Sequence, residues 1–240
     1  MGRVTMDKFI LDMSDKEILK EISEILGKKA VKPTEKIGWI TDNPSDYFRE
    51  NKVHNKDLYN LYRKGACVEE YIKTLSLTSL RNRPKDLFSL IRKQKAGNKV
   101  LEYGCGTSTH GVACAQLGCE VHVVDISPRM LAIAKQRYSN RGLPVTIHKI
   151  EKDFPVLPEK YFDTIICTDV VEHVPNPIKL LKIFITSLKV GGHIHLHVSP
   201  MINLKKGHLP QAILAWKGKG IGIMKRRFKK LSNHNYKLIK

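Results

Sequence analysis

Short apolar runs alternate with longer amphipathic segments along the middle of the chain. Five runs have the pattern of strands, at 99–103, 121–125, 145–150, 163–169 and 193–199, and helical patterns cover 128–140 and 177–188. Strands separated by helices of about 10 to 15 residues pair in parallel, because a tight turn cannot join parallel neighbours. The pattern predicts an α/β fold with a doubly wound parallel sheet over about residues 97–200.

Helical patterns also precede this core. Residues 15–29 place apolar side chains on one stripe of a helix, with Ser14 or Asp15 as its N-cap and Gly27 as its stop. We expect this helix to pack against the main domain rather than to bind a partner. The pattern over 47–95 predicts two or three further helices.

The composition excludes several classes of chain. The 240 residues are 42% hydrophobic and 27% charged, which is ordinary for soluble globular proteins and unlike disordered, collagen-like or disulfide-scaffold sequences. We divide the chain into an N-terminal helical region (1–95), a core (96–200) and a short C-terminal segment (201–240).

The charge of the chain is uneven. There are 42 Lys and Arg against 23 Asp and Glu, a net charge of +19, and the segment 201–240 holds eleven basic residues and no acidic one. Such a surface attracts polyanions, which leaves nucleic acid, anionic lipid and acidic substrates open as partners. A helix predicted over 209–231 carries apolar residues among lysines, so it either docks on the sheet or lies on an anionic membrane.

Cysteine usage and hydropathy indicate the compartment. Five cysteines form no CxxC pair, and no apolar signal segment opens the chain. No run approaches the roughly 18 uncharged apolar residues of a membrane-spanning helix. We expect a reduced, cytoplasmic protein without a transmembrane segment.

A glycine-rich turn lies between the first strand and its helix, in VLEYGCGTSTHG at 100–111. Such a turn lets the backbone approach a ligand closely, and the following helix offers unpaired N–H groups. The dinucleotide pattern GxGxxG would need glycine where Thr109 stands, and the GK[ST] of a phosphate-binding loop is absent. Both of those nucleotide sites are excluded.

The remaining pattern is Glu102-x-Gly104-x-Gly106, which resembles motif I of the class I S-adenosylmethionine-dependent methyltransferases. Those enzymes usually have a third small residue two positions on, and here it is Ser108. The resemblance implies a Rossmann-like methyltransferase sheet and a cofactor whose methionine part lies against the turn. It assigns the cofactor to the residues of the turn: Glu102, Tyr103, Gly104, Cys105 and Gly106.

A second motif is VVDISPRML at 123–131. Asp125 ends the second predicted strand, 19 residues after Gly106, and an acid in this position accepts the ribose hydroxyls in nucleotide-binding folds of this kind. Ile126 then packs on the adenine face. The alternative is that Asp125 caps the helix that begins near Pro128.

The resemblance also implies an acid after the third strand, which contacts the adenine amino group. The spacing to Asp163 points to Glu151, with Asp153 as its rival, and either is alternatively a solvated loop acid. At the end of the fourth strand we assign Thr168 to the cofactor site.

Two later segments, CTDVVEHVPNP at 167–177 and LKVGGH at 188–193, also look like motifs of this family. They resemble the branch that includes ubiquinone-biosynthesis O-methyltransferases. In LKVGGH we expect Gly191 and Gly192 to make the turn before the last parallel strand. The resemblance covers about 97–200, and the family fold needs a further helix and an antiparallel hairpin after it. The 41 residues of 200–240 leave room for the helix and one strand at 235–240, so we expect an incomplete hairpin or a truncated chain.

Asp169, Glu172 and His173 are the candidate catalytic residues, and at i, i+3 and i+4 they share a face if a helical turn begins here. Three roles stay open. His173 is a general base for the acceptor, or the three residues hold a divalent metal with His208, or Glu172 and His173 are structural. The E-x-x-E-H metal pattern occurs in some relatives, but here the first acid is the shorter Asp169. A metal is possible but not favoured.

The run HIHLH at 193–197 places His193, His195 and His197 on one side of a strand. A metal site is one interpretation. We favour histidines that are half-buried, or that lie near an edge of the sheet.

Together these patterns predict a class I methyltransferase that methylates an oxygen or nitrogen atom of a small molecule, with S-adenosylmethionine as cofactor and residues 1–95 as a possible substrate lid. The alternatives are an RNA methyltransferase, suggested by the charge, and a degenerate cofactor-binding subunit without catalysis, suggested by the short C-terminus. The acceptor, metal dependence and oligomeric state are left open.

Overall fold

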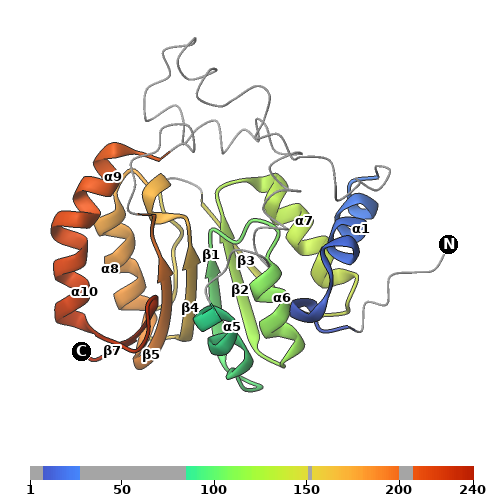
Figure 1. The fold of residues 1–240 in the computed structure, drawn as a ribbon, viewed down its shortest axis with the longest axis horizontal. Coiled ribbons are helices and arrows are strands. Elements are labelled where there is room, and N and C mark those ends of the chain that lie inside the picture. The colour runs from blue at the N-terminus through green and yellow to red at the C-terminus, as the bar shows by residue number, and fades with distance from the viewer. Residues whose placement is uncertain (1–7, 28–84, 151–152, 200–207) are drawn as a thin grey trace, which may run out of the picture.

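The computed structural model describes residues 8–27, 85–150, 153–199 and 208–240, and its centre is a seven-stranded sheet (Figure 1). The strand order is β3-β2-β1-β4-β5-β7-β6. The strands are β1 (Lys99–Tyr103), β2 (Glu120–Asp125), β3 (Thr146–Lys149), β4 (Phe162–Thr168), β5 (Leu188–His197), β6 (Phe228–Lys230) and β7 (Asn235–Leu238). The first five are parallel, and β7 runs antiparallel to both β5 and β6.

Helices cover both faces of the sheet (Figure 1). One face carries α1 (Asp15–Ile25), α5 (Lys85–Arg92), α6 (Thr109–Gln116) and α7 (Pro128–Ser139). The other carries α8 (Pro177–Ser187), α9 (Pro210–Ala215) and α10 (Ile221–Arg227), with the π-helical turn η4 (Trp216–Gly220) between the last two. Short 3₁₀ helices cover Ile10–Asp12 (η1) and Val171–His173 (η2).

The strands are apolar on both faces because both faces are covered. In β1, Val100 belongs to the core under α6, and Leu101 and Tyr103 belong to the core under α8. Their neighbour Glu102 is also buried, and it is the polar exception in the strand. The predicted parallel core and its strand positions are confirmed.

The N-terminal helix begins as predicted and ends early. Ser14 caps α1 because its side chain accepts from the Glu17 amide, and the Ser14 amide in turn donates to the Glu17 carboxylate, which makes a capping box. The helix ends at Ile25, ahead of Gly27 in the left-handed region at φ 66°. Apolar residues of α1 join the core under α6 and α7, so the expected packing on the main domain is confirmed. The helices predicted over 47–95 lie outside the described residues except for α5.

The C-terminal prediction of a single strand is wrong. Phe228–Lys230 forms β6 and pairs with β7, so the described chain contains a complete antiparallel hairpin. The expected helix over 209–231 stops at Arg227, because Phe228 turns its ring into the core under α8 and pairs with Leu238. A three-residue strand is too short for an alternating pattern to distinguish it from the end of a basic helix.

The expected turn before the last parallel strand is also wrong. β5 begins at Leu188, and Gly191 lies inside it with φ 82°. The pairing of β4 with β5 shifts here, from Phe162–Leu188 to Thr164–His193, so the two glycines absorb an irregularity in the strand. The remainder of β5 then continues in register to Thr168–His197, which places the ends of β4 and β5 side by side.

Candidate active site

The glycine turn after β1 is tied to the end of β2. The amides of Gly104 and Cys105 both donate to the Val124 carbonyl, at 2.8 and 2.9 Å. Gly104 and Gly106 have φ values of 67° and 52°, in the region that favours glycine. A Cβ on Gly104 would lie 2.2 Å from Val170 Cγ2, so both conformation and space require glycine there.

Glu102 directs its carboxylate into the turn. Its Oε2 accepts from Ser108 Oγ at 2.6 Å and from the Gly111 amide at 3.0 Å, and its Oε1 lies 3.0 Å from His110 Nδ1. Gly111 has no room for a side chain, because a Cβ would lie 2.7 Å from Glu102 Oε2. The contacts of this predicted cofactor residue thus shape the loop and the start of α6.

Two other predicted residues of the turn have buried side chains. The Tyr103 ring is buried and packs edge-on against Phe184, with centroids 5.2 Å apart, so the ring belongs to the core under α8. Cys105 donates through Sγ to the Gly106 carbonyl at 3.6 Å, and burial raises the pKa of its thiol well above the ordinary range. The thiol stays protonated at neutral pH and is not a nucleophile.

Asp125 lies at the end of β2 beside the turn. Its Oδ2 accepts from the Gly106 amide and its Oδ1 from the Ser127 amide, both at 2.8 Å. The cap of α7 is Ser127, whose hydroxyl accepts from Met130 N, so the alternative that Asp125 is the helix cap is wrong. A carboxylate has about four acceptor positions, so Asp125 keeps capacity for hydroxyl donors.

Burial raises the pKa of Asp125 to about 6 and outweighs the hydrogen bonds from Ser127 and Gly106 that lower it. The group is therefore mostly ionised at neutral pH and can accept hydrogen bonds from a ligand. Ile126 follows it, half-buried.

The predicted adenine contacts are only partly covered by the structure. Glu151 lies outside the described residues. Asp153 is exposed and lines a pocket of about 140 Å³ together with Phe154, Pro175, Asn176 and Lys179. Asp153 is thus at the wall of a small pocket, between the loop after β3 and the start of α8.

At the end of β4 the three predicted catalytic residues separate into two groups. The 3₁₀ turn η2 begins at Val171, after Asp169. The expected helical turn therefore includes Glu172 and His173 but not Asp169. Asp169 has φ 55° and pairs with His197 Nδ1 on β5, and its amide donates to the His197 carbonyl at 3.1 Å. Thr168, half-buried, is the register partner of His197.

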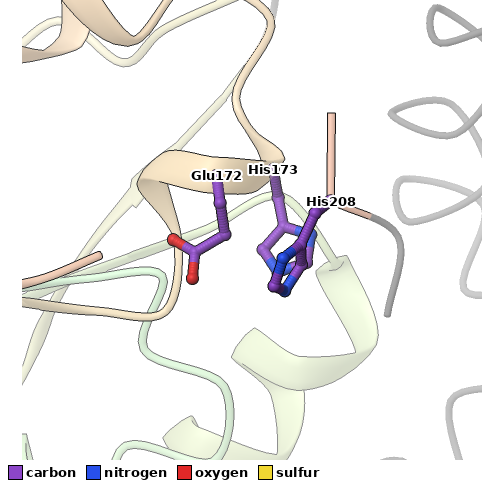
Figure 2. Close-up of side chains that lie close together, drawn as sticks. All are labelled: Glu172, His173 and His208. Atoms are coloured by element: carbon purple, nitrogen blue, oxygen red, sulfur yellow. The ribbon is translucent and has the colours of Figure 1, made fainter. Parts of the chain in front are cut away.

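The second group is Glu172 with His173 and His208 (Figure 2). The Leu209 amide donates to the Glu172 carbonyl at 2.8 Å, which brings His208 to η2. The two imidazole rings lie edge to face with centroids 5.0 Å apart, and one donor atom from each of the three residues lies within 4.8 Å of the others.

Glu172 is fully buried, and one of its oxygens is unusual. Oε1 accepts from the Ser199 amide at 3.0 Å, whereas Oε2 is a buried atom without a hydrogen-bond partner among the residues that the structure describes. Burial raises the pKa of this carboxyl to about 7, although the bond from Ser199 lowers it. Near neutral pH the group exchanges between acid and carboxylate.

One carboxylate and two imidazoles are a donor set for a borderline divalent ion such as Zn²⁺, and they suit the all-oxygen preference of Mg²⁺ less well. The unpartnered Glu172 Oε2 fits such an ion. Asp169, the first acid of the expected metal pattern, pairs with His197 instead. If a divalent ion binds, Glu172, His173 and His208 would hold it.

The HIHLH histidines do not gather around a common point among the described residues. His195 is fully buried and shares a hydrogen bond with Asn235 Oδ1 at 2.7 Å, and burial lowers its pKa to about 4. His193 and His197 are half-buried, as expected for those two. The metal interpretation of this run is therefore not supported.

Sequence reasoning missed the Asp169–His197 pair. Its signal was available, since Asp169 ends one predicted parallel strand and His197 lies two residues before the end of another, and the ends of neighbouring parallel strands meet at one edge of a sheet. Strand adjacency was the missing information: the pairing of β4 with β5 decides which strand end faces which.

A protein-family model described as a methyltransferase domain matches residues 76–228. The ubiquinone biosynthesis O-methyltransferase of Xanthomonas euvesicatoria pv. vesicatoria (strain 85-10) is 31% identical over 107 residues, which cover 44% of each chain. The protein of the same name from Proteus mirabilis (strain HI4320) is 30% identical over 125 residues, which cover 51% of this chain and 47% of that one.

A solved structure of phosphoethanolamine N-methyltransferase 2 from Haemonchus contortus, in complex with phosphomonomethylethanolamine and S-adenosylhomocysteine, is 23% identical. It matches 59% of this chain and 35% of its own, with a TM-score of 0.48. The chain thus matches about half the length of its curated relatives. In the part of the chain that the structure describes, none of the helices has the length and apolar character to cross a membrane.

Proposed function

This chain belongs to the family of methyltransferase domains, and from that premise we propose that it transfers a methyl group from S-adenosylmethionine to an oxygen or nitrogen atom of a small-molecule acceptor. The observation that carries the proposal is the joined geometry of the glycine turn and Asp125, whose Oδ2 lies 2.8 Å from the Gly106 amide. The names of the curated relatives support an O-methyltransferase.

The residues fit the cofactor as follows. The backbone of 104–106 would face its methionine part, since Gly104 and Gly106 present a bare turn without Cβ atoms. The carboxylate of Asp125 would accept the ribose hydroxyls, and Ile126 would pack on the adenine. Glu151 or Asp153 would contact the adenine amino group. When bound, the cofactor supplies a methyl group made electrophilic by its sulfonium.

The chain itself has two tasks in such a reaction. It holds the acceptor in line, which can supply about 7 to 11 kcal/mol of the acceleration when the geometry is good. It also accepts the proton that a hydroxyl or amine loses. His173 and His197 lie at the edge formed by β4 and β5, and an imidazole is a general base of the kind that this step needs.

His173 was the candidate from the sequence, and His197 is the candidate that the structure adds. In His197, Nδ1 is paired with Asp169, so Nε2 is the atom that would take the proton. Asp169 would orient the ring and stabilise the imidazolium. In the metal alternative, Glu172, His173 and His208 would hold the ion, and His173 would not be available as a base.

We propose residues 1–95 as the region that contributes a substrate lid, 96–200 as the core of the cofactor site and 201–240 as a basic segment. Four buried cysteines without disulfides, Cys105, Cys114, Cys119 and Cys167, support a reducing compartment such as the cytoplasm.

The basic segment favours an anionic membrane surface over nucleic acid as a second partner. Leu214 and Ile221 are 62% and 39% exposed, and the helical run from α9 to α10 that carries them also carries Lys217 and Lys225. Exposed apolar groups among lysines suit a lipid surface. Sedimentation with anionic and neutral vesicles tests this, and a salt-sensitive affinity for RNA without vesicle binding would contradict it.

The methyl-transfer proposal is tested by calorimetry and by labelling. We expect the full chain to bind S-adenosylhomocysteine and to label a component of fractionated cell extract from methyl-labelled S-adenosylmethionine. Asp125→Ala should abolish both. His173→Asn and His197→Asn should keep binding, and the one that removes the base should lose turnover and the acidic limb of the pH profile. Absence of binding by the unaltered chain would overturn the proposal.

A further inference from the structure

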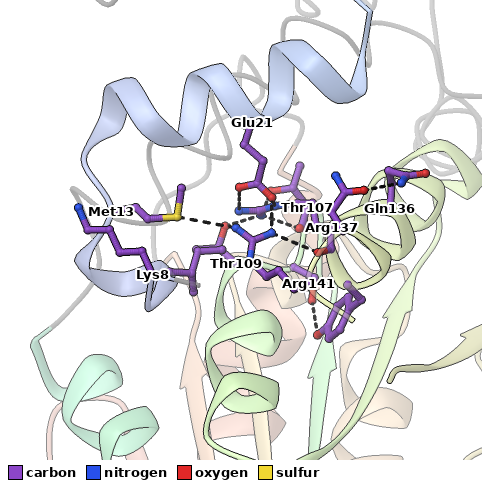
Figure 3. Close-up of polar contacts among 12 residues, drawn as sticks. Lys8, Met13, Glu21, Thr107, Thr109, Gln136, Arg137 and Arg141 are labelled. Carbon is purple, nitrogen blue, oxygen red and sulfur yellow. Dashed lines mark hydrogen bonds and ion pairs between the residues drawn. The ribbon is translucent and has the colours of Figure 1, made fainter. Parts of the chain in front are cut away.

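The helix α1 lies outside the region matched by the family model, yet it reaches the glycine turn through buried charges (Figure 3). Its residue Glu21 is fully buried, and so is Arg137 on α7. The two form a bidentate pair, with Arg137 Nε 3.0 Å from Glu21 Oε1 and Arg137 Nη2 3.1 Å from Glu21 Oε2. Arg141, which follows the end of α7, also donates to Glu21 Oε1.

The Glu21 carboxylate stays ionised over the working range of pH. Burial alone would raise its pKa, but the charge of Arg137 and the hydrogen bonds from Arg141 and Arg137 lower it to about 2. A buried guanidinium needs such a partner, because an uncompensated charge inside a protein is strongly destabilising. The Glu21 carboxylate therefore compensates the buried positive charge of Arg137.

The third nitrogen of Arg137 points to the loop. Nη1 donates to the Thr107 carbonyl at 2.7 Å, to Thr109 Oγ1 at 2.9 Å and to Thr107 Oγ1 at 3.3 Å. Thr107 directly follows Gly106, and Thr109 is the first residue of α6. One guanidinium thus joins α1 to the segment that links the glycine turn to its helix.

The residue between these two contacts is strained. Ser108 has φ 56°, in the left-handed region that costs a residue with a side chain about 1 to 2 kcal/mol. It occupies the position at which the related motif has its third small residue. Arg137 contacts the residues on both sides of it, at the Thr107 carbonyl and the Thr109 hydroxyl, and a strained residue persists only when its surroundings determine its conformation.

We propose that Glu21 is a positioning residue of the cofactor site, and that α1 sets the shape of the glycine turn through Arg137. The proposal rests on the proposed function, because the ligand of the turn is S-adenosylmethionine. It predicts that a change in α1, which lies outside the region matched by the family model and reaches the turn through Arg137, alters the affinity for the cofactor.

A matched control separates positioning from mere stability. Gln116, at the end of α6, holds the same N-terminal segment at a second point, because its Oε1 accepts from the Ile10 amide at 2.8 Å and its Nε2 donates to the Lys8 carbonyl at 2.9 Å. Gln116 is the last residue of α6, at the opposite end of this helix from the glycine turn. Gln116→Ala therefore loosens the N-terminal segment without touching the contacts at Thr107 and Thr109.

The test compares Glu21→Gln with Gln116→Ala in the full chain, by calorimetry with S-adenosylhomocysteine at a temperature at which each variant is folded. We expect both to lower the melting temperature. Only Glu21→Gln should weaken binding, by about tenfold, as expected for coupling between a site and a residue one contact removed. Equal affinities in the two variants would overturn the proposal.

A second pair probes the loop end of the same path and does not depend on the folding of Glu21→Gln. Thr109→Val removes the hydroxyl that accepts from Arg137, and Thr109→Ser keeps it. We expect weakened binding in the valine variant and wild-type affinity in the serine variant. Equal binding by both would contradict the positioning role. If the unaltered chain fails to bind the nucleoside, the proposed function fails instead, so the two failures are distinguishable.

Discussion

The two halves of the candidate site differ in how their buried polar groups are satisfied. Around the glycine turn, Glu102 and Arg137 are buried and each makes at least three polar contacts. At the ends of β4 and β5, Glu172 Oε2 and His195 Nε2 are buried and have no hydrogen-bond partner among the described residues. Both halves also hold a strained residue other than glycine, Ser108 in the first and Asp169 in the second.

This difference is the basis on which we propose different roles for the two halves. An unsatisfied buried polar group costs about 1 to 3 kcal/mol, so a protein keeps one mainly where a partner can arrive or a proton can move. The side chains that hold the turn after β1, Glu102 and Arg137, make their polar contacts within the folded chain, so the turn is preorganised for binding. The β4–β5 edge has spare donors and acceptors, and we assign the acceptor and the proton transfer to it.

The strongest test of the preorganised half is Gly104→Ala. The added Cβ would require a strained φ and would lie 2.2 Å from Val170 Cγ2, so the turn must move. We expect the affinity for S-adenosylhomocysteine to fall by more than about 100-fold, because a displaced backbone loses several contacts at once. Calorimetry measures this directly.

Gly97→Ala is the matched control for that change. Gly97 has φ 81°, but nothing lies within 4 Å of the Cβ that would be added. It should cost about 1 kcal/mol of unfolding free energy and leave cofactor affinity unchanged. If both variants lost affinity equally, backbone strain alone would account for the effect, and the close fit at Gly104 would not matter.

The next largest effect is expected for Asp125→Asn. Two hydrogen bonds from ribose hydroxyls to a carboxylate are each worth about 1.5 to 3 kcal/mol, of which the amide retains a part, so affinity should fall about 10- to 100-fold. The wild-type affinity should also weaken as the pH falls below about 6, because protonation of Asp125 removes acceptor capacity. Affinity measured between pH 5 and 8 should be flat in the variant, and a parallel slope in both proteins would assign the titration elsewhere.

Much of the preorganised half could be predicted from the sequence, because it is local. The glycine turn and Asp125 are 19 residues apart and belong to consecutive strands. The spacing in the sequence was therefore enough to predict that the glycine turn and Asp125 lie close together. What spacing could not supply was the contact of Thr107 and Thr109 with Arg137, which lies on α7 and is itself neutralised by Glu21 of α1.

The β4–β5 half was predicted less well for the same reason. Asp169, Glu172 and His173 are close in sequence, but the left-handed φ of Asp169 turns its carboxylate away to a residue 28 positions later. The short strand β6 escaped prediction because three residues carry no periodic signal. Contacts between strand ends, and strands of this length, depend on tertiary packing that one sequence does not reveal.

A smaller effect is expected for the pH dependence of stability that buried His195 of the β4–β5 half causes. Burial lowers the pKa of His195 from an ordinary 6.5 to about 4, so the unfolded chain binds a proton there first as the pH falls. The stability that depends on neutral His195 is present above pH 6.5 and is lost as the pH falls towards 4. We expect about 2 kcal/mol of this loss to disappear in His195→Phe, measured by urea unfolding at pH 7 and pH 5. An unchanged difference between the two pH values would contradict the assignment.

The smallest expected effect has the opposite sign and lies at Glu172. Its folded pKa of about 7 exceeds the ordinary 4.5, so the folded chain holds the proton longer, and stability falls as the pH rises from 4.5 to 7. Glu172→Gln removes the buried charge but brings an amide that needs a partner of its own, so the variant should be more stable at pH 8 by only about 1 kcal/mol. The same variant also distinguishes a metal-binding role of Glu172 from a purely structural role. If Glu172 is a ligand, Zn²⁺ will raise the melting temperature of the wild type and not that of Glu172→Gln. If the carboxyl only accepts from the Ser199 amide, Zn²⁺ will change the melting temperature of neither protein.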